Sequence, residues 1–116
     1  MSPKLKLLFI CTANINRSRT AEDILKNSPD YEVQSAGIIY HPAGGQVVTQ
    51  ELIDWADRIF VMDENNDRHL TSLRNNFNVF DKDAYVLNVP DIYNRGNSVL
   101  VELLKKRLAS IGGIKV

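Results

Sequence analysis

The sequence predicts an α/β fold, a three-layer α/β/α sandwich built around a four-stranded parallel sheet. Short apolar segments alternate with amphipathic ones along the 116 residues, an alternation typical of strands joined by helical crossovers. The composition, 44% hydrophobic and 24% charged, is that of an ordinary globular protein. A chain of this length suffices for one hydrophobic core, so we expect a single domain over residues 1–116.

The first strand and the first helix are expected on either side of a polar turn. Leu5–Ile10 is an apolar run that ends at polar residues, which indicates a buried strand. A helix is expected over Ser18–Lys26, because its apolar residues fall on one face. The Asn-Ser-Pro-Asp segment at 27–30 ends this helix.

A second strand, a loop and a second helix follow. Alternating polarity over Tyr31–Ser35 predicts the strand. Ala36–Gly45 contains glycines and a proline and is expected to be a loop. The helix is indicated by apolar residues that recur along one helical face, namely Val48, Leu52, Trp55 and Ala56.

The third and fourth strands are expected at Arg58–Met62 and Ala84–Leu87. Asp63 is expected to cap the helix between them, whose Leu70 and Leu73 point inward.

A polar loop, Asn88–Gly96, separates the fourth strand from the last helix. This helix begins at Asn97 or Ser98, and Gly112-Gly113 ends it. Its expected apolar stripe is Leu100, Leu103, Leu104, Leu108 and Ile111.

The carboxyl ends of parallel strands lie at one edge of a sheet, and ligands bind beyond that edge. With right-handed crossovers, four strand-following segments should meet there. They are Cys11, Ala36–Gly45, Asp63 and Asn88–Gly96.

Charge and cysteine content exclude several classes of protein. Lys plus Arg and Asp plus Glu are 14 each, so no general basic surface exists for a nucleic acid. The single cysteine excludes an internal disulfide and a multi-thiol metal site. The longest apolar run, Leu7–Ile10, is too short to span a membrane, and the first residues lack the apolar core of a secretory signal. We expect a cytoplasmic monomer without a nucleic-acid or membrane partner.

The segment between the first strand and the first helix carries the predicted chemistry. Cys11 stands at the strand exit, and Arg17 stands six residues later where the helix begins. The backbone N–H groups between them can curl inward and, with the helix N-terminus, form a nest for phosphate or sulfate. The predicted phosphate-binding residues are Thr12, Ala13, Asn14, Ile15, Asn16, Arg17 and Ser18.

The same environment predicts a nucleophile. Arg17 can grip two oxygens of a phosphoryl group, and the positive surroundings favour the thiolate of Cys11. Ser18 can donate a hydrogen bond to the sulfur. The simpler interpretation is that Cys11 is a small core residue. Its place among turn-forming polar residues at the ligand edge argues against this.

A thiolate that displaces an alcohol needs an acid to protonate the leaving oxygen. Asp91, in the loop after the fourth strand, is the best placed carboxylic acid. Asp63 is expected to cap a helix, while Asp81 and Asp83 precede the fourth strand and lie at the wrong edge. The simpler interpretation of Asp91 is an aspartate that shapes a turn.

These motifs resemble the low-molecular-weight protein tyrosine phosphatase family. The segment from Ile10 to Glu22 resembles the family's phosphate-binding loop, and Ser35-Ala36-Gly37 resembles its Ser-Ala-Gly segment. Asp91-Ile92-Tyr93 resembles the Asp-Pro-Tyr loop that carries the general acid. The similarity is greatest to a short bacterial branch of the family. It implies that family's fold, an enzyme without metal or other cofactor, and a phosphorylated protein or small phosphoester as substrate.

The resemblance also implies roles for individual residues. Cys11 would be the nucleophile, Arg17 would bind phosphate and stabilise the transition state, and Asp91 would act as acid and then as base. Asn14 would hold the loop in a left-handed turn, hydrogen-bonded to Ser35.

The implied supporting residues are Asn14, Ser18 and Ser35, with Ser18 tuning the thiolate. The implied substrate wall is Ile15 and Tyr93, and Tyr40 and His41 are the candidates in the shortened region after Gly37.

Three positions depart from the family pattern. Asn16 stands where a second cysteine is frequent, so no disulfide can protect Cys11. Ile92 replaces the proline after the acid, which predicts a less rigid acid loop. Arg19 replaces the proline after Arg-Ser and adds positive charge.

Other residues have simpler interpretations. His41 is expected in a loop and His69 on a helix surface, because no cluster of metal ligands accompanies either. Gly44-Gly45 is interpreted as a turn, Trp55 as a core residue, and 105–107 as a solvated basic helix face.

Two other functions fit the same loop. An arsenate reductase would bind arsenate there, and with one cysteine it would need an external thiol to resolve the adduct. A phosphate- or phospholigand-binding module without turnover would keep the nest and lack a competent acid.

Overall fold

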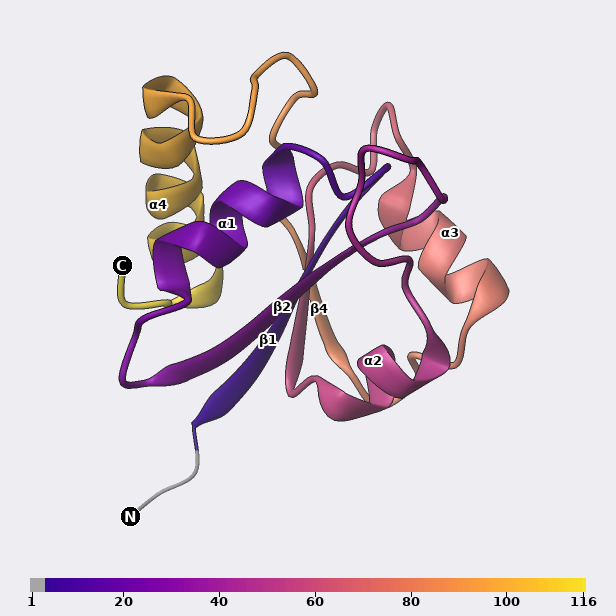
Figure 1. Ribbon diagram of the computed structural model, residues 1–116. Coiled ribbons are helices and arrows are strands. Elements are labelled where there is room, and N and C mark those ends of the chain that lie inside the picture. Colours follow the sequence, from indigo (N-terminus) through magenta and orange to yellow (C-terminus); the bar gives the residue numbers. More distant parts are fainter. Residues whose placement is uncertain (1–3) are drawn as a thin grey trace.

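The computed structural model describes residues 4–116, which are organised by a parallel sheet with the strand order β2-β1-β3-β4 (Figure 1). The strands are β1 Leu5–Cys11, β2 Tyr31–Gly37, β3 Arg58–Val61 and β4 Asp83–Val86. The helices are α1 Arg17–Leu25, α2 Gln50–Trp55, α3 His69–Asn76 and α4 Ser98–Gly112. The predicted fold class and element order are confirmed. Residues 1–3, part of the segment in which we expect no secretory signal, lie outside the described residues.

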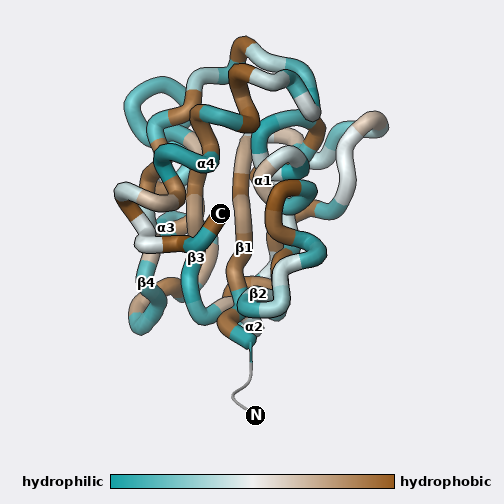
Figure 2. Tube along the Cα trace, turned by 90° about the vertical axis from the view of Figure 1, so that its left-hand side faces the viewer, coloured by the Kyte–Doolittle hydropathy of each residue, from teal (hydrophilic) through white to brown (hydrophobic). Residues whose placement is uncertain are grey.

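The sheet separates two hydrophobic cores, with α1 and α4 on one face and α2 and α3 on the other (Figure 1). Leu7 and Phe9 of β1 belong to the first core, and Leu8 and Ile10 belong to the second. All four side chains are fully buried because β1 is an interior strand covered on both faces. In Figure 2 most of β1 is accordingly coloured hydrophobic.

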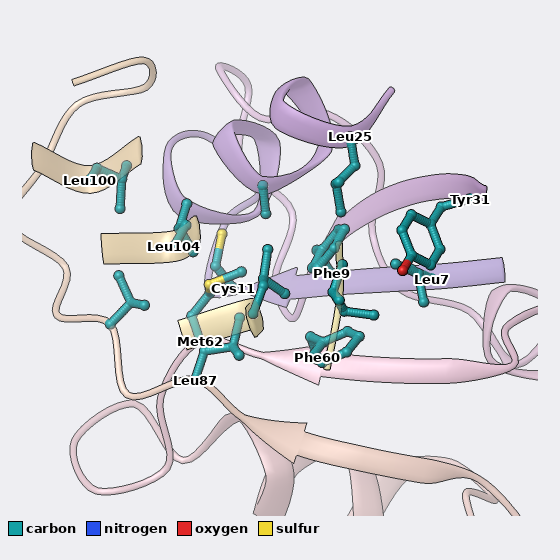
Figure 3. Packing of buried hydrophobic residues seen from close by; sticks show 14 residues of the cluster. Leu7, Phe9, Cys11, Leu25, Tyr31, Phe60, Met62, Leu87, Leu100 and Leu104 are labelled. Carbon is teal, nitrogen blue, oxygen red and sulfur yellow. The ribbon is translucent and has the colours of Figure 1, made fainter. Parts of the chain in front are cut away.

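The first core fixes the direction in which β1 leaves the sheet. Phe9 stacks on Phe60 at 5.5 Å between ring centroids, Leu25 of α1 lies beside Phe9, and Leu104 of α4 lies beside Cys11 (Figure 3). Cys11 belongs to the same cluster and lies at the carboxyl end of β1 (Figure 3). The packing of α1 against the sheet therefore determines where the chain turns after Cys11.

Three details of the predicted elements are wrong. Val48 is buried but precedes α2, because the chain there follows the β2 exit through a bridge between Gly37 and Val47. Ile111 is 37% exposed, because in the last turn of α4 it is Gly112 that lies against the core residue Phe60, while Leu100, Leu104 and Leu108 are buried in the turns before it.

The third detail concerns α3. Asp63 does not cap this helix, because its carboxylate accepts the N–H groups of Asn66 and Asp67 in the preceding loop. The chain then turns through Arg68 in a left-handed conformation, at φ 56°, and the helix starts at His69. The end of α4 matches the prediction, with Gly113 left-handed at φ 65°.

None of the helices over residues 4–116 is both long and apolar enough to span a membrane.

Candidate functional site

The loop over Cys11–Ser18, here called the anion loop, turns several of its carbonyl groups toward the segment that follows β2. The carbonyl oxygens of Cys11, Thr12 and Asn14 accept hydrogen bonds from backbone N–H groups of segment 38–45. Asn14 is left-handed, at φ 54°, a conformation that Asn tolerates better than most residues. This turn reverses the backbone between the strand and the helix.

The backbone N–H groups of the anion loop have no such partners. Within residues 4–116, none of the N–H groups of residues 12–18 donates to a protein acceptor. These N–H groups lie where α1 begins, and the N-terminus of α1 adds partial positive charge there. Such a concave set of free donors binds a tetrahedral anion.

Glycines allow segment 37–45 to lie directly behind the anion loop. A Cβ on Gly44 would overlap the Ala13 carbonyl oxygen, and one on Gly45 would overlap the Asn14 side chain. The Gly45 N–H instead donates to the Asn14 carbonyl at 3.1 Å. The glycines interpreted as a turn therefore also brace the back of the anion loop.

The thiol of Cys11 is 3% exposed and lies 3.0 Å from Ser18 Oγ. Ser18 Oγ accepts a 2.7 Å hydrogen bond from Asn14 Nδ2, which leaves its own hydrogen to donate to the sulfur. Asn14 Nδ2 also donates to Ser35 Oγ at 2.9 Å, and Ser35 donates to Glu22. Asn14, Ser18 and Ser35 thus form one buried chain that ends at the sulfur.

Arg17 is buried, at 1% exposure, and most of its donors are held by the protein. Nη1 donates to the Val89 carbonyl at 3.0 Å and pairs with Asp67 at 2.8 Å, while Nη2 reaches Thr12 Oγ1 at 3.4 Å. These contacts leave Nε–H and one Nη2–H for a ligand. Two parallel donors of this kind match two oxygens of a phosphoryl group.

Asp91 lies at the mouth of the same site. Its carboxylate is 58% exposed and 3.7 Å from Arg17 Nε. It closes a small pocket of about 110 Å³ together with the anion loop. The lining residues are Cys11, Thr12, Ala13, Ile15, Asn16, Arg17 and Asp91.

The loop that carries Asp91 is tied to the start of α1. Arg95 makes two 2.8 Å hydrogen bonds to the Asp23 carboxylate, and its N–H donates to Asn16 Oδ1 at 3.0 Å. The next N–H, of Gly96, donates to Thr20 Oγ1 at 3.1 Å. Sequence reasoning missed Arg95, because its partners lie more than seventy positions earlier in the chain.

The predicted substrate wall is less complete. Ile15 lines the pocket. Tyr40 is 74% exposed, Tyr93 packs partly against the first core, and neither lines the pocket. His41 is exposed in its loop, as expected, with Nδ1 accepting the Ala43 N–H.

The prediction that His69 lies on a helix surface is wrong, because its side chain is 1% exposed. Nε2 lies 3.0 Å from Thr12 Oγ1, and Nδ1 accepts the Asp63 N–H at 3.1 Å. Asp67, which sequence reasoning did not single out, reaches Arg17 from the same loop. The helical period of α3 predicts that Leu70 and Leu73 point inward, but it does not indicate which segment covers the first turn of the helix.

Burial and, to a smaller extent, the positive charge of Arg17 together lower the pKa of His69 to about 4, against the opposing charges of Asp67, Asp63 and Asp91. Burial alone would raise the pKa of Asp63. The N–H groups of Asp67 and Asn66, the charge that His69 carries once protonated, and the charge of Arg17 outweigh that effect and lower the pKa of Asp63. His69 is therefore neutral near pH 7 and can donate only from Nε2, because Nδ1 is an acceptor.

This pKa predicts a pH dependence of stability. Below pH 6.5 the unfolded chain protonates His69, whereas the native state resists protonation down to about pH 4. The contribution of His69 is complete above pH 6.5 and is lost toward pH 4, by about 3 kcal/mol. Urea unfolding at several pH values should show that the free energy of unfolding falls less for His69→Gln than for the wild type between pH 6.5 and pH 4. His41→Gln is the control and should show the same fall as the wild type. An equal fall in all three proteins would contradict the assignment of this pH dependence to His69.

Residues 6–49 match the model of the family described as low molecular weight phosphotyrosine protein phosphatase. That match covers β1 from Lys6 onward, the anion loop, α1 and β2. No curated protein sequence matches the chain.

Solved structures share the fold over nearly the whole chain. Wzb of Vibrio vulnificus, in complex with benzylphosphonate, is 22% identical with a TM-score of 0.71, over 90% of this chain and 94% of that one. A YwlE mutant from Bacillus subtilis is 21% identical with a TM-score of 0.69, over 91% of this chain and 97% of that one. A thioredoxin-dependent arsenate reductase from Corynebacterium glutamicum is 20% identical with a TM-score of 0.56, over 91% of this chain and 57% of that one.

Proposed function

Since the chain resembles the low molecular weight phosphotyrosine protein phosphatase family through residues 6–49 and has that family's fold, we propose that it is a cysteine-dependent phosphomonoesterase. Cys11 is the nucleophile, Arg17 and the anion loop bind the phosphoryl group, and Asp91 is the general acid. The chemistry uses only these groups and water.

In the first step the Cys11 thiolate attacks phosphorus, so that an S–P bond forms as the ester P–O bond breaks. Asp91 gives its proton to the leaving oxygen. The N–H groups of residues 12–18 and the free donors of Arg17 stabilise the charge on the three equatorial oxygens. The product of this step is cysteinyl-phosphate and a free alcohol or phenol.

In the second step the Asp91 carboxylate takes a proton from a water molecule that attacks phosphorus. The S–P bond breaks, inorganic phosphate leaves, and the thiolate and the protonated acid are restored. The hydrogen bond from Ser18 stabilises the sulfur each time it departs as thiolate.

A single observation carries this proposal: N–H donors and two Arg17 donors that have no hydrogen-bond acceptor within residues 4–116 line one pocket with the Cys11 thiol, and a carboxylate lies 3.7 Å from Arg17 at its mouth. The proposed substrate is an aryl phosphate such as phosphotyrosine, in a protein or a small ester. The Wzb structure with benzylphosphonate supports this class.

The proposed form is a cytoplasmic monomer, in keeping with the single unpaired cysteine. Turnover of a panel of phosphotyrosine, phosphoserine and nitrophenyl phosphate tests the activity.

An anion should occupy the loop in crystals grown with phosphate or sulfate. Its oxygens are expected about 2.7–3.1 Å from the N–H groups of residues 12–18, and from Nε and Nη2 of Arg17. Nη1 should keep its contacts to Val89 and Asp67. An anion seen in such a crystal with Arg17 turned away from it would contradict the proposed nest.

Arsenate reduction is a second candidate, and the fold shared with the Corynebacterium glutamicum reductase favours it. Arsenate would occupy the anion loop and Cys11 would form the arseno-thiol bond. The chain has one cysteine, so a small external thiol must resolve the adduct. Consumption of arsenate that depends on added thiol, without turnover of aryl phosphates, would favour this activity over phosphoester hydrolysis.

A further inference from the structure

The hydroxyl of Thr12, the residue next to the nucleophile, is approached by two donors. His69 Nε2 lies 3.0 Å from Thr12 Oγ1, and Arg17 Nη2 donates to the same oxygen at 3.4 Å. Thr12 also lines the pocket beside Cys11. The position of this hydroxyl hydrogen therefore bears on how the pocket binds its ligand.

The direction of the His69 contact follows from the other ring nitrogen. Nδ1 accepts the Asp63 N–H at 3.1 Å, so a neutral ring carries its hydrogen on Nε2. Nε2 then donates and Thr12 Oγ1 accepts. The burial of His69, at 1% exposure, keeps the ring neutral, and a proton on Nδ1 would face the Asp63 N–H.

A threonine hydroxyl has two acceptor lone pairs and one hydrogen. The donors of His69 and Arg17 occupy the two lone pairs, so the hydrogen must point elsewhere. No acceptor for it is present among residues 4–116. Because Thr12 lines the pocket, this hydrogen can be donated to the ligand that the backbone N–H groups bind.

We propose that His69 is a positioning residue which, through its Nε2–H, directs the Thr12 hydroxyl hydrogen at an oxygen of the bound phosphoryl group. Thr12 thereby becomes a side-chain ligand of phosphate, in addition to the backbone nest and Arg17. The proposal rests on the proposed function only in taking a phosphoryl group as the ligand of this pocket.

Calorimetric binding of inorganic phosphate to the intact protein tests the proposal without requiring turnover. Thr12→Val removes the hydroxyl at nearly constant shape and should weaken phosphate binding roughly 10- to 100-fold, as expected for a hydrogen bond to a charged group. Thr12→Ser keeps the hydroxyl and should restore most of the affinity. Circular dichroism establishes that each variant is folded.

Two substitutions separate the functions of the His69 ring. His69→Asn keeps an acceptor near the position of Nδ1 but removes the Nε2–H donor to Thr12. Phosphate binding should therefore weaken about tenfold. His69→Gln places an N–H near the Nε2 position and should recover affinity. In a Thr12→Val background His69→Asn should have less than about a twofold further effect, because His69 acts through the Thr12 hydroxyl.

Unchanged phosphate affinity in Thr12→Val would overturn the proposal, and so would an equal effect of His69→Asn in both backgrounds. The latter result would give His69 a purely structural role. A wild type that binds phosphate with this pattern but hydrolyses no ester would overturn the proposed function alone. A wild type that hydrolyses esters while Thr12→Val keeps full phosphate affinity would overturn this inference alone.

Discussion

Replacing Cys11 by serine is expected to reduce aryl phosphate hydrolysis by roughly 10⁴-fold or more, while phosphate still binds. The serine hydroxyl is a far weaker nucleophile than a thiolate at neutral pH. The neighbouring group, Ser18 Oγ at 3.0 Å, is placed to donate to the nucleophile and not to remove its proton. Binding persists because the N–H groups of residues 12–18 and Arg17 supply it.

The measurement is nitrophenyl phosphate turnover, with and without a chelator, beside phosphate affinity for both proteins. Wild-type activity should survive the chelator, because the proposed steps use no metal ion. Trapping of a phosphorylated wild-type protein, absent from Cys11→Ser, would place the phosphoryl group on sulfur. Undiminished turnover by Cys11→Ser would remove Cys11 from the mechanism. Phosphate binding without turnover by the wild type would favour a binding module.

Asp91→Asn is expected to slow phosphotyrosine hydrolysis about 10²–10⁴-fold and nitrophenyl phosphate hydrolysis much less in the first step. Asparagine keeps the shape of aspartate but has no proton to give to the leaving oxygen. Nitrophenolate leaves readily without protonation, whereas the tyrosine phenolate does not. Phosphate affinity should change little, because the N–H groups of residues 12–18 and Arg17 supply the binding.

Single-turnover rates on the two esters separate this role from a structural one. Water attack on cysteinyl-phosphate should also slow, so a phosphoenzyme can accumulate in the variant. Asp83→Asn is the matched control, since Asp83 begins β4 at the opposite edge of the sheet. A uniform loss on both esters, in step with a lower melting temperature, would limit Asp91 to shaping its loop. The search for an acid would then turn to Asp67, the other carboxylate in contact with Arg17.

The rigidity of the loop that carries Asp91 depends on Ile92, which follows it, and on contacts made a few residues later. The absence of a proline at 92 predicts a less rigid acid loop. The structure ties this loop down a few residues later, through the two Arg95 hydrogen bonds to Asp23 and the bond to Asn16. Asn16 stands where the resemblance leads one to expect a cysteine, and its side chain contributes to this attachment.

Local patterns were enough to predict the order of the elements and the position of the anion loop. The apolar run ending at Cys11, and the helical period after Arg17, depend on residues only a few positions apart. Parallel topology then brings Cys11 and Asp91 to one sheet edge, because connections between parallel strands return to the same end. Asn14 in a left-handed turn and its bond to Ser35 were likewise anticipated from the family resemblance.

The surroundings of that loop were decided by tertiary structure. His69 was expected in solvent, but it lies buried against Thr12, which is 57 positions away in the sequence. Asp67 and Arg95 reach Arg17 and Asp23 over similarly long separations. Periodicity shows which face of an element is apolar, but it carries no information about which polar side chain meets a donor from a distant segment. Such pairs form only when packing excludes water from them, because a buried polar group must then find its partner within the protein.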